Sequence, residues 1–178
     1  AGALVLIEGA GSLPVAELAG LAEAAVIAGL LHDIKRREAD HAVKGSIEAD
    51  RILTDLGMDK RLRGFVVYAI RSHEAFKAVC ELGDEAGCLV SDALYDADKF
   101  RWGPENFTTT LWTMVQDRGT PPDRLHSVFP EKMKGIEQIK TTFRTSTGRT
   151  YGPEIIDQGL AIGSAIYKEM TLMLKNGL

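Results

Sequence analysis

The sequence predicts an all-α fold, a single-domain bundle of helices, and three observations support this. Apolar residues recur at helical spacing through most of the chain, whereas the alternation typical of β-strands is nearly absent. The length of 178 residues suits one domain, and a hydrophobic content of 45% is enough for a substantial core. No internal repeat or low-complexity linker interrupts the sequence. One helical domain over residues 1–178 is therefore the simplest architecture.

Apolar stripes and the residues that begin and end helices locate the first elements. The predicted helices cover about 14–31, 41–56, 59–76, 84–99 and 104–116. Pro14 falls in the first turn of the first helix, where proline is tolerated. Gly57 follows the second helix, as glycine commonly does at a helix end. Residues 1–14 are apolar and start abruptly, as if within a helix.

The second half of the chain is less regular. A loop at 119–122, indicated by its prolines, precedes a helix predicted over 130–142. The stretch 141–152 is rich in Thr, Ser, Arg and Gly, and a surface loop is the simplest interpretation, although its hydroxyls and arginines would also suit a phosphate. A last amphipathic helix follows Pro153 and reaches about Lys175. It could pack on the core or form a homodimer contact.

Charge and composition limit the classes of partner. The net charge is −4, which argues against a dedicated nucleic-acid binder but leaves room for a small phosphorylated substrate in a locally positive pocket. No stretch has the roughly 20 apolar residues that span a bilayer, so we expect a soluble, cytoplasmic protein without membrane association. The two cysteines, Cys80 and Cys88, are too few for a disulfide scaffold and are interpreted as core residues.

Three of the four histidines fall on predicted inward helix faces. His32 continues the stripe of Leu21, Ala25 and Ala28, and Asp33 follows it directly. The other two are His41 and His73, and Asp98 also lies on an apolar stripe. Buried imidazoles and carboxylates are costly without partners, and one metal centre in the bundle core would satisfy them together.

Each of these features also has a simpler interpretation. A single inward histidine is often a hydrogen-bonded core residue, and a His-Asp pair occurs often by chance. Asp92, Asp96 and Asp98 could form a solvated acidic face. The metal centre is favoured because it explains the three histidines and the His-Asp pair at once.

Four short motifs resemble the HD-domain metal-dependent phosphohydrolase superfamily. They are Ala28-Gly-Leu-Leu-His-Asp-Ile34, His41-Ala-Val-Lys-Gly-Ser-Ile-Glu-Ala49, Ala69-Ile-Arg-Ser-His73 and Tyr95-Asp-Ala-Asp-Lys-Phe100. Their order and spacing agree with the family from His32 to about Trp102. The resemblance divides the chain into core motifs at 14–102 and a C-terminal helical extension at 103–178, which it does not place.

This resemblance implies an HD-type helical bundle with a specific set of metal ligands. His32, Asp33 and Asp98 would hold a metal, with Asp96 as the fallback for Asp98. His41 and His73 would complete a second metal position. The family's first ligand is a histidine on the preceding helix, and residues 1–31 contain none. That ligand either lies upstream of residue 1, as the abrupt start favours, or is lost.

The function expected from the resemblance is metal-dependent hydrolysis of a nucleotide or another small phosphate ester. The cofactor would be one or two divalent ions of Mn, Fe, Zn, Ni or Co. Asp33 would bridge the metals or orient water and Lys35 would act beside it, while Lys99, Arg101 and Arg71 would hold substrate phosphates. Two alternatives stay open: a di-iron oxygenase of the HD type, and a non-catalytic regulatory module with a degenerate site.

Overall fold

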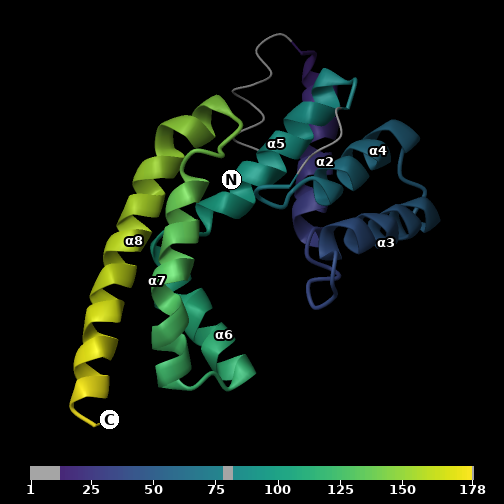
Figure 1. The fold of residues 1–178 in the computed structure, drawn as a ribbon. Helices are drawn as coiled ribbons and strands as arrows, with labels where there is room; N and C mark the ends of the chain where they lie inside the picture. Colours follow the sequence, from purple (N-terminus) through teal and green to yellow (C-terminus); the bar gives the residue numbers. More distant parts are fainter. Residues whose placement is uncertain (1–12, 78–81, 178) are drawn as a thin grey trace. The chain divides into compact units, whose positions relative to one another are not determined.

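The structure, a computed structural model, is helical throughout the residues that it describes, which are 13–77 and 82–177 (Figure 1). No strand occurs among these residues, so the all-α prediction is confirmed. The helices are α2 (Val15–Leu31), α3 (His41–Asp55), α4 (Lys60–Arg71), α5 (Glu85–Phe100), a π-helical turn η1 (Asn106–Thr110), α6 (Leu111–Arg118), α7 (Pro122–Ile139) and α8 (Ser146–Lys175).

The chain divides into two compact units. The described part of the first unit comprises residues 13–77, 82–98 and the short segment Arg144–Gly148. The second comprises Lys99–Phe143 and 149–177. This division falls close to the one expected between the core motifs and the C-terminal extension, except that Arg144–Gly148 belongs with the first unit.

In the first unit, α4 packs against both α2 and α3. The shared core is built from small and branched apolar residues, among them Leu21, Ala28, Ala49, Leu53, Phe65, Val66, Ala69, Ile70, Val90 and Leu94. Asp59 begins α4 by accepting hydrogen bonds from the backbone N–H groups of Arg61 and Leu62. The close packing brings the C-terminal end of α2, the N-terminal end of α3 and the C-terminal end of α4 to one place.

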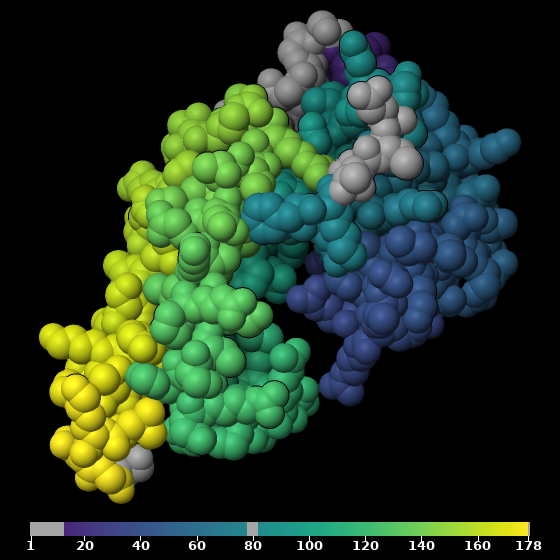
Figure 2. All heavy atoms as spheres, viewed as in Figure 1, coloured from purple at the N-terminus to yellow at the C-terminus, as the bar shows by residue number. Residues whose placement is uncertain are grey.

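The second unit has a separate core in which aromatic residues are prominent. Its buried members are Phe107, Leu125, Phe129, Ile136, Ile139, Phe143, Ile156 and Leu160. Within this unit α7 and α8 run side by side (Figures 1 and 2). Gly159 of α8 permits a close approach, because a Cβ there would lie 2.6 Å from the Trp102 carbonyl oxygen.

Three predicted element boundaries are wrong. Helix α4 ends at Arg71 and not near Phe76, because the Ser72 hydroxyl and the His73 ring take the carbonyls of Tyr68 and Ile70. His73 therefore follows the helix instead of lying on it. Helix α7 begins at Pro122, and Pro130 lies inside it.

The predicted loop at 141–152 is also corrected, since α8 begins at Ser146 and Pro153 lies within it. Thr145 accepts a hydrogen bond from the Gly148 N–H and so caps this earlier start. The apolar stretch 1–12 and Cys80 lie outside the described residues. Among the helices of the described chain, none combines the length and apolar character needed to cross a membrane.

Candidate metal centre

Two of the predicted ligand histidines sit just beyond helix ends and are oriented in the same way. His32 follows α2, and its Nδ1 lies 2.8 Å from the Gly29 carbonyl oxygen. His73 follows α4, and its Nδ1 lies 2.6 Å from the Ile70 carbonyl oxygen. A carbonyl oxygen only accepts, so each Nδ1 carries the hydrogen and each neutral ring keeps a lone pair on Nε2. Ligand histidines usually donate their second ring N–H in this manner.

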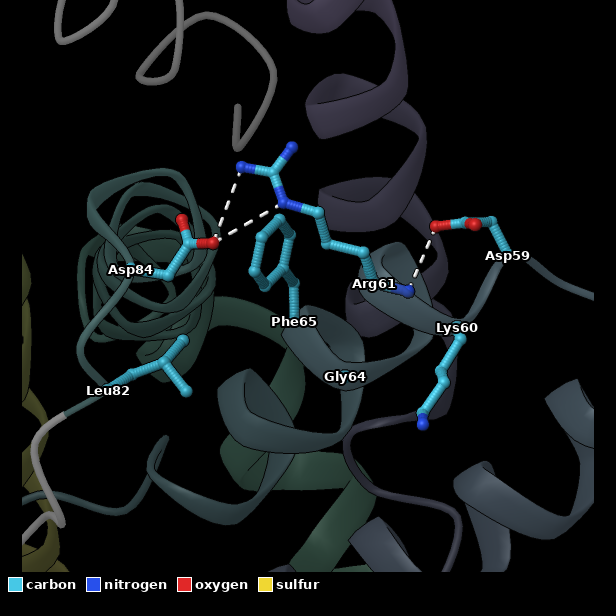
Figure 3. Close-up of a pocket in the computed structure, with 7 residues that line it drawn as sticks. All are labelled: Asp59, Lys60, Arg61, Gly64, Phe65, Leu82 and Asp84. Atoms are coloured by element: carbon cyan, nitrogen blue, oxygen red, sulfur yellow. Dashed lines mark hydrogen bonds and ion pairs between the residues drawn. The ribbon is translucent and has the colours of Figure 1, made fainter.

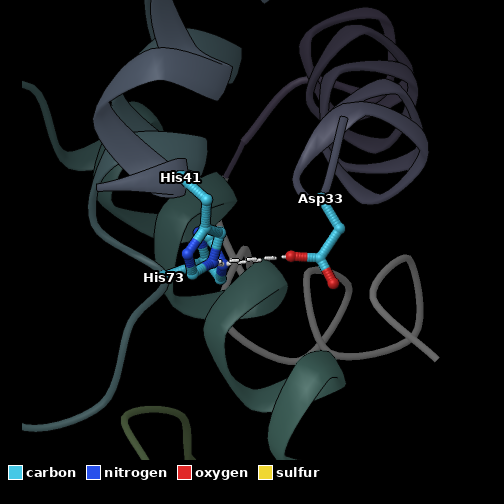
Figure 4. A group of neighbouring side chains, drawn as sticks. All are labelled: Asp33, His41 and His73. Carbon is cyan, nitrogen blue, oxygen red and sulfur yellow. Dashed lines mark hydrogen bonds and ion pairs between the residues drawn. The ribbon is translucent and has the colours of Figure 1, made fainter. Parts of the chain in front are cut away.

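The third histidine meets them from the start of α3. The Nε2 atoms of His41 and His73 are 3.3 Å apart, and Oδ1 of Asp33 lies 3.6 Å from the first and 3.8 Å from the second. Figure 4 shows the two rings together with the Asp33 carboxylate opposite them. One ligand atom from each residue lies within 4.8 Å of the others, which is close enough for all three to bind one ion.

Arg36 fixes the orientation of the His41 ring. Its Nη1 lies 3.2 Å from His41 Nε2. A guanidinium group only donates hydrogen bonds, so this Nε2 must carry a lone pair. The hydrogen of His41 is then on Nδ1, which faces Oε1 of Glu74 at 3.8 Å. When both rings are neutral, the unprotonated Nε2 atoms of His41 and His73 lie 3.3 Å apart.

Asp33 adds a third unshared electron pair at the same place. Its Oδ1 is buried and has no hydrogen-bond partner, although Arg36 Nη1 lies 3.7 Å away. Leaving a buried carboxylate oxygen without a hydrogen bond is costly. Two imidazole nitrogens and one carboxylate oxygen converge here, and the Arg36 guanidinium is a donor that faces them. A divalent cation that prefers nitrogen and oxygen ligands fits this arrangement.

The other oxygen of Asp33 faces a second pair of predicted ligands. His32 Nε2 lies 3.5 Å from Asp33 Oδ2 and 3.8 Å from Asp98 Oδ1. Asp98 is largely buried, with 7% of its side chain exposed. Asp33 thus lies between two groups of donors, His41 with His73 on one side and His32 with Asp98 on the other. His32, His41 and His73 thus lie beside Asp33, and Asp98 lies beside His32.

Asp96, the fallback for Asp98, has a different role. It is fully buried and accepts hydrogen bonds from the backbone N–H groups of Arg144 and Thr145 and from the Thr145 hydroxyl. Both of its oxygens are therefore engaged by the segment before α8. Asp98 is the carboxylate that approaches His32.

The predicted phosphate-binding cations are divided between the two units. Lys35 lies 3.5 Å from Glu38, and Arg71 is exposed at the end of α4. Lys99 and Arg101 belong to the second unit. Lys99 is buried in α5, and the Arg101 guanidinium lies over the Trp102 ring at 4.8 Å from its centroid.

Two residues at the centre, Arg36 and Glu74, were not predicted from the sequence. Glu74 follows His73 just as Asp33 follows His32, and this parallel is the signal that could have identified it. Burial raises the pKa of Glu74, but the hydrogen bond from Lys77, the charge of Lys77 and the charges that His41 and His73 carry when protonated outweigh it and lower the pKa overall. Glu74 is therefore an anion beside His41 at neutral pH.

A cavity of about 570 Å³ lies elsewhere in the first unit, and none of the predicted ligands lines it (Figure 3). Arg61 crosses it, with its guanidinium over the Phe65 ring and hydrogen-bonded to Asp84 and Glu17. Arg61 and Asp84 of this cavity are thus hydrogen-bonded to each other, in contrast to Asp33 Oδ1, which has no hydrogen-bond partner.

Comparison of the chain with protein-family models, with curated proteins and with solved structures finds no match. The resemblance to HD-domain phosphohydrolases therefore stands on the four sequence motifs alone.

Proposed function

We propose that this protein is a metal-dependent phosphohydrolase that acts on a nucleotide or another small phosphate ester. The observation that carries the proposal is the convergence of His41 Nε2, His73 Nε2 and Asp33 Oδ1 within 4.8 Å, with the buried Asp33 oxygen lacking a hydrogen bond. The motif resemblance supports the same reading, because the five gathered residues occupy its ligand positions.

The five residues form two groups, each of which would bind one metal ion. His41, His73 and Asp33 would hold one divalent ion, and His32, Asp98 and the second oxygen of Asp33 would hold another. A bound divalent ion supplies Lewis acidity, which favours ionisation of water near neutral pH and draws charge from a phosphoryl oxygen. Asp33 contributes one oxygen to each group and so would fix the distance between the two metal positions.

Arg36 is the cation best placed to bind a substrate phosphate. Its guanidinium touches His41 and lies near Asp33, yet 51% of its side chain is exposed, so it faces both the ligands and the solvent. Guanidinium groups bind phosphate oxygens through paired hydrogen bonds. Arg36 takes this role in preference to Lys35, whose recorded partner is Glu38.

Metal content is the first test. The protein would be purified without chelator, reconstituted separately with Mn²⁺, Fe²⁺, Co²⁺, Ni²⁺ and Zn²⁺, and analysed for bound metal beside the variants His41→Ala and His73→Ala. His126→Ala is the matched control, because His126 lies in the second unit and is hydrogen-bonded to Thr171. We expect both site variants to lose metal and the control to keep it.

Activity would then be measured with p-nitrophenyl phosphate, bis-p-nitrophenyl phosphate and a panel of nucleotides. We expect metal-dependent release of phosphate or nucleoside that falls at least about 100-fold in His73→Ala. Arg36→Ala should raise KM for the phosphate ester more than it lowers kcat. Failure to bind any of the five metals would overturn the proposal. Substrate-dependent O₂ uptake by the iron form, without hydrolysis, would replace it with the oxygenase alternative.

A further inference from the structure

The segment Arg144–Gly148 is fixed to α5 by a buried carboxylate, although it is distant in sequence. Asp96 Oδ1 accepts from the Arg144 N–H at 2.9 Å, and Oδ2 accepts from the Thr145 N–H at 2.8 Å and the Thr145 hydroxyl at 2.6 Å. The Thr145 hydroxyl oxygen also accepts from the Gly148 N–H. A fully buried carboxylate with this many charge-assisted hydrogen bonds holds its partners firmly.

This anchor delivers the Arg144 side chain to the end of α4. Nη2 of Arg144 donates to the Ser72 carbonyl oxygen at 3.2 Å, and Nη1 lies 3.7 Å from Asp92. The guanidinium carbon lies 3.7 Å from the centroid of the Tyr95 ring, which is buried. The stacking, the ion pair and the hydrogen bond together leave the guanidinium plane one orientation.

The orientation of the Ser72 carbonyl affects the position of His73. Ser72 caps α4, and its carbonyl belongs to the peptide that leads directly into His73. Carbonyls at the end of a helix lack partners within the helix, and a cation there also opposes the helix dipole. The Ser72 side chain is held as well, because its hydroxyl bonds to Tyr68 O at 2.7 Å and pairs with Ser91 Oγ at 2.8 Å.

We infer that Arg144 is a positioning residue for the metal centre: by binding the Ser72 carbonyl it sets the peptide that aims His73 at Asp33 and His41. The inference rests on the proposed metal centre and adds to it a residue from outside the ligand motifs. His73 is fixed at two points, its own ring bond to Ile70 O and the Arg144 bond to the preceding peptide. Removal of Arg144 leaves a mostly buried carbonyl without this donor, and the peptide can then rotate away.

Binding of Co²⁺, followed by its visible absorption, tests this inference. The d–d bands of Co²⁺ depend on the number and geometry of its ligands, so they report on His73 where a general loss of stability would not. Arg144→Ala should bind Co²⁺ about ten-fold more weakly and show altered bands. This is the size of effect expected when a residue that orients a metal ligand is removed. Arg144→Lys keeps a donor for the carbonyl and should recover part of the affinity.

Two variants serve as controls. Arg51→Ala removes an exposed arginine of the same unit, paired with Glu48 and Asp55, and should leave the bands and the affinity unchanged. Ser91→Ala removes the partner of the Ser72 hydroxyl while Arg144 stays, so it should have a smaller effect in the same direction. If Arg144→Ala folds too poorly for a Co²⁺ titration, Ser91→Ala and Arg144→Lys are used to test the inference instead.

The outcomes separate this inference from the proposed function. The positioning role alone is overturned if Arg144→Ala binds Co²⁺ with wild-type affinity and wild-type bands. If Arg144→Ala does not fold, the role is overturned when both Ser91→Ala and Arg144→Lys leave the affinity and the bands unchanged. An equal loss in Arg51→Ala would also overturn it, because the effect would not be specific. Absence of Co²⁺ binding by the wild-type protein would overturn the metal centre and the positioning role together.

Discussion

Asp40, which precedes the ligand His41, has a backbone conformation that few residues other than glycine adopt. Its φ is 54° and its ψ is 39°, in the left-handed region, and its side chain makes no capping hydrogen bond to α3. Aspartate and asparagine enter this region more easily than other residues with a Cβ, because their short polar side chains can interact locally. The turn between His32 and His41 therefore depends on the residue type at position 40.

Substitutions at Asp40 should follow backbone preference and not charge. We expect Asp40→Ala to lower the free energy of unfolding by about 1 kcal/mol, whereas Asp40→Gly and Asp40→Asn should leave it close to that of the wild type. Urea denaturation followed by circular dichroism measures the difference. If all three variants lose the same stability, the charge of Asp40 matters more than its conformation.

Single residues of the centre could be predicted to different extents. His32, Asp33, His41, His73 and Asp98 stand out in the sequence because apolar periodicity and motif order are local properties, and the structure brings Asp33, His41 and His73 within 4.8 Å of one another. Arg144 could not be predicted, because its bond to Ser72 joins residues 72 positions apart. Arg36 was passed over for its neighbour Lys35, since only the geometry of the turn decides which of two adjacent cations faces the ligands.

Among the elements, α4 and α5 pack so closely that the space beside Gly87 admits no further carbon. A Cβ at Gly87 would lie 2.2 Å from a Leu82 methyl carbon and 2.6 Å from the Phe65 ring, and Phe65 is buried. Gly45 of α3 differs, because its nearest contact to an added Cβ is an ordinary 3.5 Å. The two glycines form a matched pair of helical positions.

Substitution by alanine should change the stability of the protein in different ways at Gly87 and at Gly45. Gly87→Ala should destabilise the protein by about 1–3 kcal/mol through overpacking against Phe65. Gly45→Ala should be neutral or stabilise it by up to about 1 kcal/mol, since alanine favours the helix and finds room. Urea midpoints of both variants test the packing. A stable Gly87→Ala variant would mean that α5 does not lie against Phe65 as described.

The residues at the start of α5 make the stability of the protein depend on pH. Asp84 accepts from the backbone N–H groups of Ala86 and Gly87 and pairs with Arg61. Burial raises the pKa of Asp84, but the Arg61 hydrogen bond, the Gly87 N–H and the Arg61 charge outweigh it, so the pKa lies below that of an ordinary aspartate. A lowered pKa in the folded state stabilises the protein above the unfolded-state pKa. That stabilisation is lost as the pH falls through the folded-state pKa.

We therefore expect Asp84→Ala to cost about 1 kcal/mol at neutral pH, mainly through loss of the cap. Asp84→Asn keeps a capping oxygen and isolates the charge. Its deficit relative to the wild type should be constant between about pH 5 and pH 8 and should shrink below about pH 4. Chemical denaturation across this range measures it. A deficit for the asparagine variant that persists unchanged at low pH would show that ionisation of Asp84 is not its source.

Element prediction succeeded where stripes were regular and failed where several residues could start a helix. The spans predicted for α2, α3 and α5 agree closely with those observed. The sequence predicts helices that begin at Pro130 and just after Pro153, but both prolines lie inside helices. Proline is favoured in a first turn and disfavoured in an interior, and burial of Phe129 and Ile156 in the core offsets that cost.

At the scale of the whole molecule, the C-terminal end of α5 and the N-terminal end of α8 each cross the boundary between the units. Helix α5 passes from the first unit to the second after Asp98, and α8 passes after Gly148. Because helical hydrogen bonds form cooperatively, we expect order in the first unit to extend along these two helices across the boundary. Metal binding in the first unit should therefore stabilise the second unit as well.

The tryptophans make this coupling measurable. Both tryptophans of the chain, Trp102 and Trp112, belong to the second unit, whereas the metal ligands belong to the first. Metal at about 100 times its dissociation constant should raise the free energy of unfolding by about 2.7 kcal/mol. If the units unfold together, urea midpoints from tryptophan fluorescence and from circular dichroism should shift equally, and neither should shift in His73→Ala. A shift in circular dichroism alone, with the fluorescence midpoint unchanged, would mean that α5 and α8 break at the boundary and that the units unfold independently.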